Sequence, residues 1–133
     1  MKIRNQNPVI VFVCEHGAAK SVIAAAYFNK LAQEANLGLR AIARGTDPDR
    51  ELSPKAMAGL RADGLTPAES IPQKLSAAEI ESAQRIVAFC ELPDEHQLHT
   101  SIEQWEAIPP ASEDYKKARD AILERLNQLI YQM

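Results

Sequence analysis

The sequence predicts a single-domain α/β protein, a three-layer sandwich in which a central four-stranded parallel sheet carries helices on both faces. The first observation is the continuous apolar run at residues 9–13, which is typical of a strand buried on both faces. The second is a helical pattern and another short strand directly after it, a βαβ unit that requires parallel strands and a right-handed crossover. The third is the length of 133 residues, which suffices for one core and is too short for two. Residues 1–133 are therefore expected to form one domain.

The composition excludes several classes of protein. The formal net charge is −3, which gives no indication of nucleic-acid or membrane-surface binding. Residues 1–8 are polar, so neither a signal peptide nor a membrane span is expected there, and we predict a cytoplasmic protein with reduced thiols. The two cysteines and three scattered histidines form no zinc or disulfide pattern, so neither a metal nor a cofactor is expected.

After the first strand, the chain alternates between helices, strands and loops. Residues 21–35 carry apolar side chains at helical spacing with alanines between them, which predicts a helix that packs closely on the sheet. Residues 39–49 contain a short strand as far as residue 44 and then a loop. Ser53 before Pro54 predicts the start of the next helix, and Gly64 predicts its end.

The second half of the chain continues this alternation. Residues 65–74 contain two prolines and are predicted to be a loop. Ser76 and Glu79 have the spacing of a capping box, which predicts a short helix before a third strand at residues 85–90. The remaining predicted elements are a fourth strand or edge segment at residues 101–105, a loop at residues 106–111 and a last helix at residues 112–131.

Residues 14–21, which we call the cysteine loop, have the features of an anion site. Cys14 ends the first strand, at the edge of a parallel sheet where ligands bind. The loop is long enough to turn several backbone N–H groups toward one oxyanion, and the helix after it adds about half a positive charge. The residues predicted to surround the oxyanion are Glu15, His16, Gly17, Ala18, Ala19 and Lys20.

Three side chains of the cysteine loop could carry chemistry. The field of the helix favours the thiolate form of Cys14, which would make it a nucleophile. Lys20 supplies positive charge at the mouth of the loop, and the Ser21 hydroxyl can donate a hydrogen bond to the thiolate. Each residue also has a purely structural interpretation: Cys14 as a small buried side chain, Lys20 as a solvated charge, Ser21 as an N-cap and His16 as a loop residue without a role.

The cysteine loop, preceded by its apolar strand, resembles the phosphate-binding loop of the low-molecular-weight protein tyrosine phosphatases and of the arsenate reductases that share their fold. His16 and Gly17, with the alanines in the following helix, resemble the arsenate reductase branch more closely. The resemblance extends over almost the whole chain and implies a Cys-x5-Arg-Ser loop, here with Lys20 at the arginine position. Because an ammonium is a point charge whereas a guanidinium contacts two oxygens in one plane, we expect anion binding to be retained but weakened.

The general acid of these families is missing from its expected place. They carry an Asp-Pro pair in a loop after a tryptophan, and its aspartic acid protonates the leaving oxygen. This chain has Pro109 and Pro110 there. General acid catalysis is typically worth about 10²–10⁴ in rate, so hydrolysis of esters with poor leaving groups should suffer most. Glu106, Glu113 and Asp114 are near in sequence and are either substitutes or surface charges.

Cys90 is predicted to end the third strand as Cys14 ends the first, which places both thiols at the same edge of the sheet. It is either a buried structural cysteine or a resolving thiol that attacks an adduct on Cys14. Thiol-cascade arsenate reductases similar to this chain have a further cysteine a few residues later, whereas residues 91–97 contain none. A three-cysteine relay is therefore excluded, and a two-cysteine relay or an external low-molecular-weight thiol remains open.

Three functions are consistent with these features. The first is a phosphatase in which Cys14 attacks a phosphate ester, and the second is an arsenate reductase in which Cys90 or an external thiol reduces the adduct. The third is a catalytically degenerate relative that binds an oxyanion or a phosphorylated protein without turnover. The expected catalytic residues are Cys14, Lys20, Ser21 and Cys90. The expected partners are a small oxyanion or phosphate ester and, for reduction, a thiol reductant; the protein is expected to be a monomer or weak dimer without nucleic-acid or membrane partners.

Overall fold

The computed structural model describes residues 9–92, 102–111 and 113–132, and within them four parallel strands form one sheet in the order β2-β1-β3-β4. The strands are β1 (Val9–Cys14), β2 (Arg40–Gly45), β3 (Arg85–Ala88) and β4 (Ile102–Gln104). β1 is central and pairs with β2 over its whole length, so that Cys14 lies beside Gly45. The predicted four-stranded parallel sheet is confirmed.

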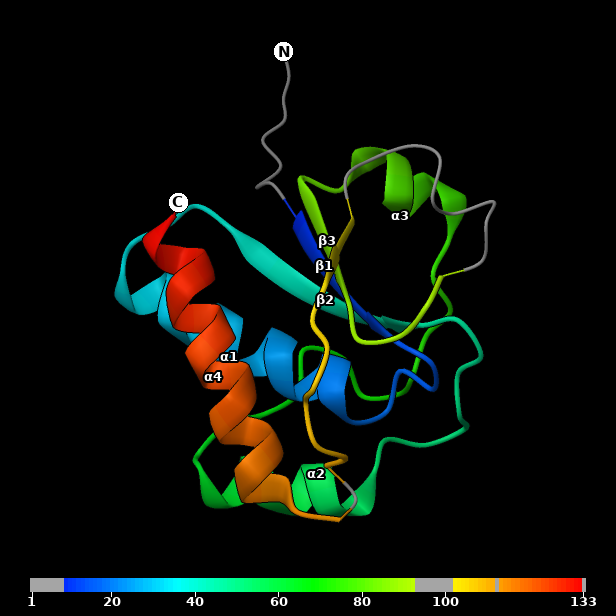
Figure 1. Ribbon diagram of the computed structural model, residues 1–133, viewed down its shortest axis with the longest axis vertical. Coiled ribbons are helices and arrows are strands. Elements are labelled where there is room, and N and C mark those ends of the chain that lie inside the picture. The colour runs from blue at the N-terminus through cyan, green and yellow to red at the C-terminus, as the bar shows by residue number, and fades with distance from the viewer. Residues whose placement is uncertain (1–8, 93–101, 112, 133) are drawn as a thin grey trace.

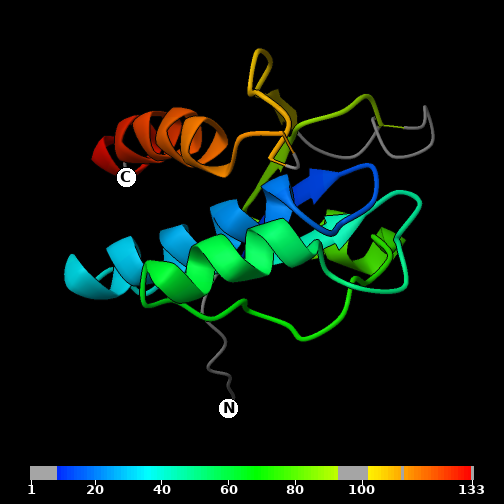
Figure 2. The ribbon, with the colours of Figure 1, turned by 90° about the horizontal axis from the view of Figure 1, so that it is seen from below.

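Helices cover both faces of this sheet, as predicted (Figures 1 and 2). In the described part of the chain they are α1 (Lys20–Glu34), α2 (Pro54–Ala62), α3 (Ala77–Ser82) and α4 (Tyr115–Tyr131). The side chains of β1 alternate between two cores: Ile10 and Phe12 pack with α1, α2 and α4, whereas Val11 and Val13 pack with Ile80 of α3. A strand with a core on each face must be apolar throughout, which is the pattern that the sequence shows.

The helix ends follow the local signals of the sequence. Ser53 caps α2 by accepting a hydrogen bond from the Ala56 N–H, and Gly64 follows that helix with a φ of 80°. Ser76 and Glu79 form both hydrogen bonds of the predicted capping box. These caps satisfy backbone groups that a helix leaves unpaired at its ends.

The outer edge of β2 is closed by side chains and by a following loop. The Asn29 side chain donates to the Ala41 carbonyl at 3.1 Å and accepts from the Ala41 N–H at 2.7 Å. The Arg44 guanidinium donates to the Ala43 carbonyl at 2.8 Å. The backbone of Gly45 pairs with residues 73 and 75. Edge strands with free backbone groups invite pairing with other chains, and this edge is largely occupied.

Two predicted boundaries that concern the candidate site were wrong: the end of the third strand and the start of the last helix. The third strand ends at Ala88 rather than at residue 90, because β4 pairs only as far as Ala88, and Cys90 lies two residues beyond the strand. The last helix begins at Tyr115 with Asp114 as its N-cap, whose side chain accepts from the Lys117 N–H, so Glu113 lies before the helix. Residues 93–97, 101 and 112, on which other predictions fell, lie outside the described residues.

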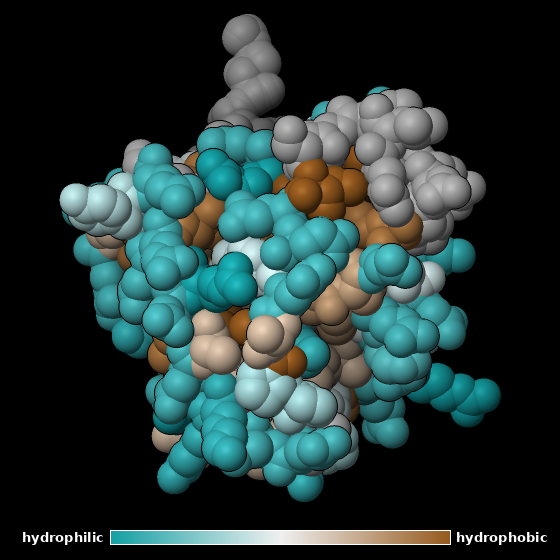
Figure 3. Space-filling model, viewed as in Figure 1, coloured by the Kyte–Doolittle hydropathy of each residue, from teal (hydrophilic) through white to brown (hydrophobic). Residues whose placement is uncertain are grey.

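The surface is mainly polar on the face seen in Figure 3. Among the described residues, the large hydrophobic side chains that are exposed are Ile71 and Tyr131. No helix within the described ranges has the length and apolar character needed to cross a membrane.

Candidate active site

Cys14 and Ser21 meet at the two ends of the cysteine loop. Cys14 is the last residue of β1, and Ser21 is a buried residue in the first turn of α1. Their Sγ and Oγ atoms lie 3.0 Å apart. The N-cap of α1 is Ala19, so Ser21 is not the cap that the sequence allowed as an alternative, and its hydroxyl is placed to hydrogen-bond the sulfur.

The carbonyl groups of the cysteine loop are directed outward, toward the chain that follows β2. The Cys14, Glu15 and His16 carbonyls accept from the N–H groups of residues 46, 47 and 49 at 3.2, 2.7 and 3.0 Å, and the Ala18 carbonyl accepts from Ser53 at 2.9 Å. No hydrogen bond from the backbone N–H groups of residues 15–19 to another described residue is found. Inward-facing, unpaired N–H groups at the start of a helix are what an oxyanion requires.

Two glycines allow the cysteine loop to lie against the end of β2. Gly17 has a φ of 61°, which side-chain-bearing residues rarely adopt. A Cβ on Gly45 would lie 2.7 Å from the Gly17 nitrogen and 2.9 Å from the His16 carbonyl carbon. The two backbones are therefore in direct contact, and the end of β2 supports the curve of the loop.

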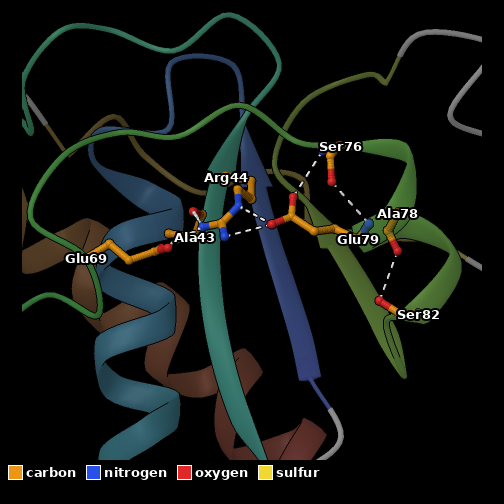
Figure 4. Close-up of polar contacts among 7 residues, drawn as sticks. All are labelled: Ala43, Arg44, Glu69, Ser76, Ala78, Glu79 and Ser82. Carbon is orange, nitrogen blue, oxygen red and sulfur yellow. Dashed lines mark hydrogen bonds and ion pairs between the residues drawn. The ribbon is translucent and has the colours of Figure 1, made fainter.

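The residue before Gly45, the buried Arg44, is held by two partly buried carboxylates in what we call the Arg44 cluster (Figure 4). Arg44 donates to Glu79 of α3 at 2.7 Å and to both carboxylate oxygens of Glu69 at 2.6 Å. Burial alone would raise the pKa of Glu79, but hydrogen bonds from Arg44 and from the Ser76 backbone outweigh it and lower that pKa. The Arg44 cluster thus fixes the end of β2 to α3 and to the loop of residues 65–74.

A cavity of about 520 Å³ opens over the cysteine loop. It is lined by Cys14, Glu15, His16, Ala18, Ala19, Lys20, Asp49, Ser53, Pro54, Phe89, Cys90, Pro110 and Ala111. Gly17 and Ser21 are the predicted site residues outside this lining: Gly17 shapes the loop, and Ser21 lies behind Cys14. On one wall the Phe89 ring packs edge-on against the buried Trp105, at 5.7 Å between centroids.

Charged groups of both signs stand on the rim of this cavity. The His16 Nδ1 lies 3.3 Å from the Asp49 carboxylate and 3.3 Å from the Asp47 carbonyl, and its Nε2 lies 3.9 Å from Glu15. Lys20 lines the cavity and forms no ion pair with another described residue. Its ammonium is thus available to a bound anion.

Cys90 reaches the same cavity even though it lies beyond the strand. Burial raises the pKa of its thiol above the ordinary value, and the nearby negative charges of Cys14 and Glu15 act in the same direction. A hydrogen bond with Thr46 and the charge of Lys20 oppose this shift in pKa without cancelling it. Cys90 is therefore a thiol whose surroundings disfavour the thiolate form.

The acidic residues considered from the sequence are not those that line the cavity. Pro110 lies in the lining, next to Pro109, where the resemblance implies the acid, but Glu106, Glu113 and Asp114 do not line the cavity. The sequence reasoning missed Asp49, which does. A signal was present: the loop after β2 leaves the same edge of the sheet as the cysteine loop, so its polar residues belonged among the candidates.

The sheet, the cysteine at the end of its first strand and the loop around it place the chain in the class of cysteine-dependent phosphatases and reductases. The family model for low molecular weight phosphotyrosine protein phosphatases matches residues 9–107, and the chain belongs to that family. A comparison with curated protein sequences gave no match.

Solved structures support the assignment of the fold. The low molecular weight protein tyrosine phosphatase from T. tengcongensis aligns with a TM-score of 0.82 at 16% identity, covering 95% of this chain and 99% of that chain. YfkJ from Bacillus subtilis aligns at 0.81 and 16% identity, covering 97% and 96%. An arsenate reductase from Archaeoglobus fulgidus aligns at 0.72 and 24% identity, covering 91% and 98%. The fold is thus shared with both phosphatases and arsenate reductases.

Proposed function

We propose that the protein is a cysteine-dependent phosphatase whose nucleophile is Cys14 and whose substrate is a phosphate monoester. The observation that carries this proposal is the cavity over the cysteine loop, which Cys14 lines, together with the backbone N–H groups of residues 15–19, for which the described part of the chain offers no backbone partner. A phosphoryl group has three peripheral oxygens, which the N–H groups and the positive end of α1 would bind. Lys20 would neutralise part of their charge.

The reaction would proceed in two displacement steps. In the first, the Cys14 thiolate attacks phosphorus, an S–P bond forms, and the P–O bond to the leaving group breaks as that oxygen takes up a proton. In the second, water attacks phosphorus, the S–P bond breaks, and phosphate leaves with the thiolate restored. The Ser21 hydroxyl, 3.0 Å from the sulfur, would stabilise the thiolate as attacking and as leaving group.

Hydrolysis of p-nitrophenyl phosphate tests this proposal, because nitrophenolate leaves readily without much help from an acid. Cys14→Ser should lower kcat/KM by at least about 10³-fold, since a hydroxyl is a far weaker nucleophile than a thiolate. Cys90→Ser is the matched control and should retain the activity. Hydrolysis that persists in Cys14→Ser would contradict the proposal.

A second function, arsenate reduction, is favoured by one further observation: Cys14 and Cys90 line the same cavity. Cys14 would displace an oxygen from arsenate to form an S–As(V) adduct. The Cys90 thiolate would then attack the Cys14 sulfur, and the S–As electron pair would pass to arsenic, which leaves as arsenite while a disulfide forms. An external thiol would reduce the disulfide.

Thiol-dependent formation of arsenite distinguishes the two functions. If reduction is the function, arsenite forms in the presence of a dithiol, Cys90→Ser abolishes it, and p-nitrophenyl phosphate remains a poor substrate. If neither reaction occurs and inorganic phosphate still binds, the protein is the degenerate oxyanion-binding or phosphoprotein-binding relative that the sequence also allowed.

A further inference from the structure

A phosphatase of this kind needs a group that protonates the leaving oxygen, and Pro109 and Pro110 cannot supply one. Within the described residues, the titratable side chains that line the cavity are Cys14, Glu15, His16, Lys20, Asp49 and Cys90. Cys14 is the proposed nucleophile, and burial keeps the Cys90 thiol a poor acid by raising its pKa. A lysine ammonium donates its proton too reluctantly at neutral pH to serve. The choice therefore falls on Glu15, His16 and Asp49.

His16 and Asp49 are joined at two points. The Asp49 N–H donates to the His16 carbonyl at 3.0 Å, and the Asp49 carboxylate lies 3.3 Å from the His16 Nδ1. The Asp47 carbonyl, 3.3 Å from the same Nδ1, is a second acceptor. Two acceptors around one ring nitrogen keep the proton on Nδ1 and fix the orientation of the imidazole. The other nitrogen, Nε2, is then the one that can give and take a proton.

We propose that His16, oriented by Asp49, is the general acid of this protein and replaces the aspartic acid that Pro109 and Pro110 displace. This inference rests on the proposed phosphatase function. In the first step, the proton on Nε2 of the imidazolium passes to the leaving oxygen as the P–O bond breaks. In the second step, the neutral Nε2 takes a proton from the attacking water, which restores the imidazolium. His16 is the catalytic residue in this scheme, and Asp49 is a positioning residue.

The dependence of rate on the leaving group is the decisive measurement. In the wild type, kcat/KM for aryl phosphates should change little from p-nitrophenyl to phenyl phosphate, because the acid protonates the poorer leaving group. In His16→Gln, we expect a loss of about 10²–10⁴-fold with phenyl phosphate and less than about tenfold with p-nitrophenyl phosphate. Asp49→Asn should lower kcat/KM for the two substrates in the same pattern but by smaller factors, because an amide oxygen still accepts from Nδ1.

The pH profile gives a second readout that a purely structural role would not move. The charges that face the ring are the Asp49 and Glu15 carboxylates, with Lys20 and the two thiols on the cavity wall. If His16 supplies the proton, any alkaline limb in the pH profile of kcat/KM for phenyl phosphate should be absent in His16→Gln.

Asp120→Asn is the matched control, because Asp120 pairs with Arg119 on α4 and does not line the cavity. It should leave both the leaving-group dependence and the pH profile unchanged.

Three outcomes bear on the inference. An equal loss of kcat/KM for good and poor leaving groups in His16→Gln, together with weaker binding of inorganic phosphate, would show that His16 only holds the two loops together and would overturn the inference. The same selective loss in Glu15→Gln instead would assign the acid to Glu15. A wild type without Cys14-dependent hydrolysis of any aryl phosphate would overturn the proposed function itself.

Discussion

At the scale of single residues, the chain departs from the implied Cys-x5-Arg-Ser loop by carrying Lys20 at the arginine position. Of its departures, this one bears most directly on the affinity for an anion. The ammonium is unpaired among the described residues and lines the cavity. It can make one strong contact with an anion, whereas a guanidinium in the same place could make two parallel hydrogen bonds. Lys20 therefore keeps the charge of the site and gives up part of its geometry.

Lys20→Arg should tighten the binding of inorganic phosphate by roughly tenfold, equivalent to about 1.4 kcal/mol, because it restores two-point contact with the oxyanion. Isothermal titration with phosphate measures this directly. Lys30→Arg is the control, since Lys30 pairs with Glu34 on the exposed side of α1 and should not alter the affinity. An unchanged or weaker affinity in Lys20→Arg would show that the arginine fork does not fit this loop.

The contact between Asp49 and His16 is one that could not be predicted from the sequence alone. The cysteine, serine and lysine stand in one short segment, so their proximity follows from the chain itself. Asp49 meets His16 only because the loop after β2 runs along the cysteine loop and hydrogen-bonds to it at residues 46, 47 and 49. No local pattern in the sequence encodes that alignment, although parallel strands do place both loops at one edge.

At the scale of elements, the contact between the end of β2 and the cysteine loop determines the shape of the site. Gly45 is buried, and its backbone lies against that of Gly17. The Arg44 cluster anchors this end of β2 from the other side. The loop is thus supported by a strand that carries none of the proposed catalytic residues.

Gly45→Ala should therefore damage anion binding, although Gly45 itself does not line the cavity. The added methyl would lie 2.7 Å from a backbone nitrogen that cannot yield, so loop and strand must separate. We expect a loss of about 1–3 kcal/mol in the free energy of unfolding and weaker binding of phosphate. Urea unfolding and phosphate titration measure the two effects. Gly38→Ala, which would meet no atom within 4 Å, should change neither; phosphate binding at full strength in Gly45→Ala would refute the supporting role of β2.

The elements themselves were largely predictable, and the reasons are local. A continuous apolar run, a proline after a capping serine and a Ser-x-x-Glu box each specify structure within a few residues, and β1, α2 and α3 follow them. The third strand was predicted two residues too long because Phe89 and Cys90 continue its apolar pattern, whereas the strand ends where its partner β4 ends. Pairing between distant segments decides such ends, and one sequence does not reveal it.

At the scale of the whole molecule, one carboxylate joins the three helices on one face of the sheet. Asp63 follows α2 and accepts from the Tyr27 hydroxyl of α1 at 2.5 Å and from the Tyr115 hydroxyl of α4 at 2.8 Å. Arg119 of α4 adds an ion pair at 3.2 Å. Burial, followed by the hydrogen bond and charge of Asp63, raises the pKa of Tyr27 to about 12, and the same causes raise the pKa of Tyr115.

These raised pKa values predict how stability depends on alkaline pH. In the unfolded chain a tyrosine loses its proton near its ordinary pKa of 10.0, whereas in the folded protein Tyr27 keeps it to about 12. The stabilisation is complete below pH 10 and is lost as the pH rises toward 12. Between these pH values the tyrosine loses its proton only in the unfolded state, and this deprotonation lowers the free energy of that state. Urea unfolding at stepped pH should therefore show a steep fall in the free energy of unfolding of the wild type across this range.

Tyr27→Phe should lower the free energy of unfolding by about 1 kcal/mol at pH 7, because a hydrogen bond is lost, and that free energy should fall less steeply above pH 10. Tyr131→Phe, at a side chain that is 94% exposed, should follow the wild type; a Tyr27→Phe curve parallel to the wild type above pH 10 would show that the Asp63 contacts do not hold this proton.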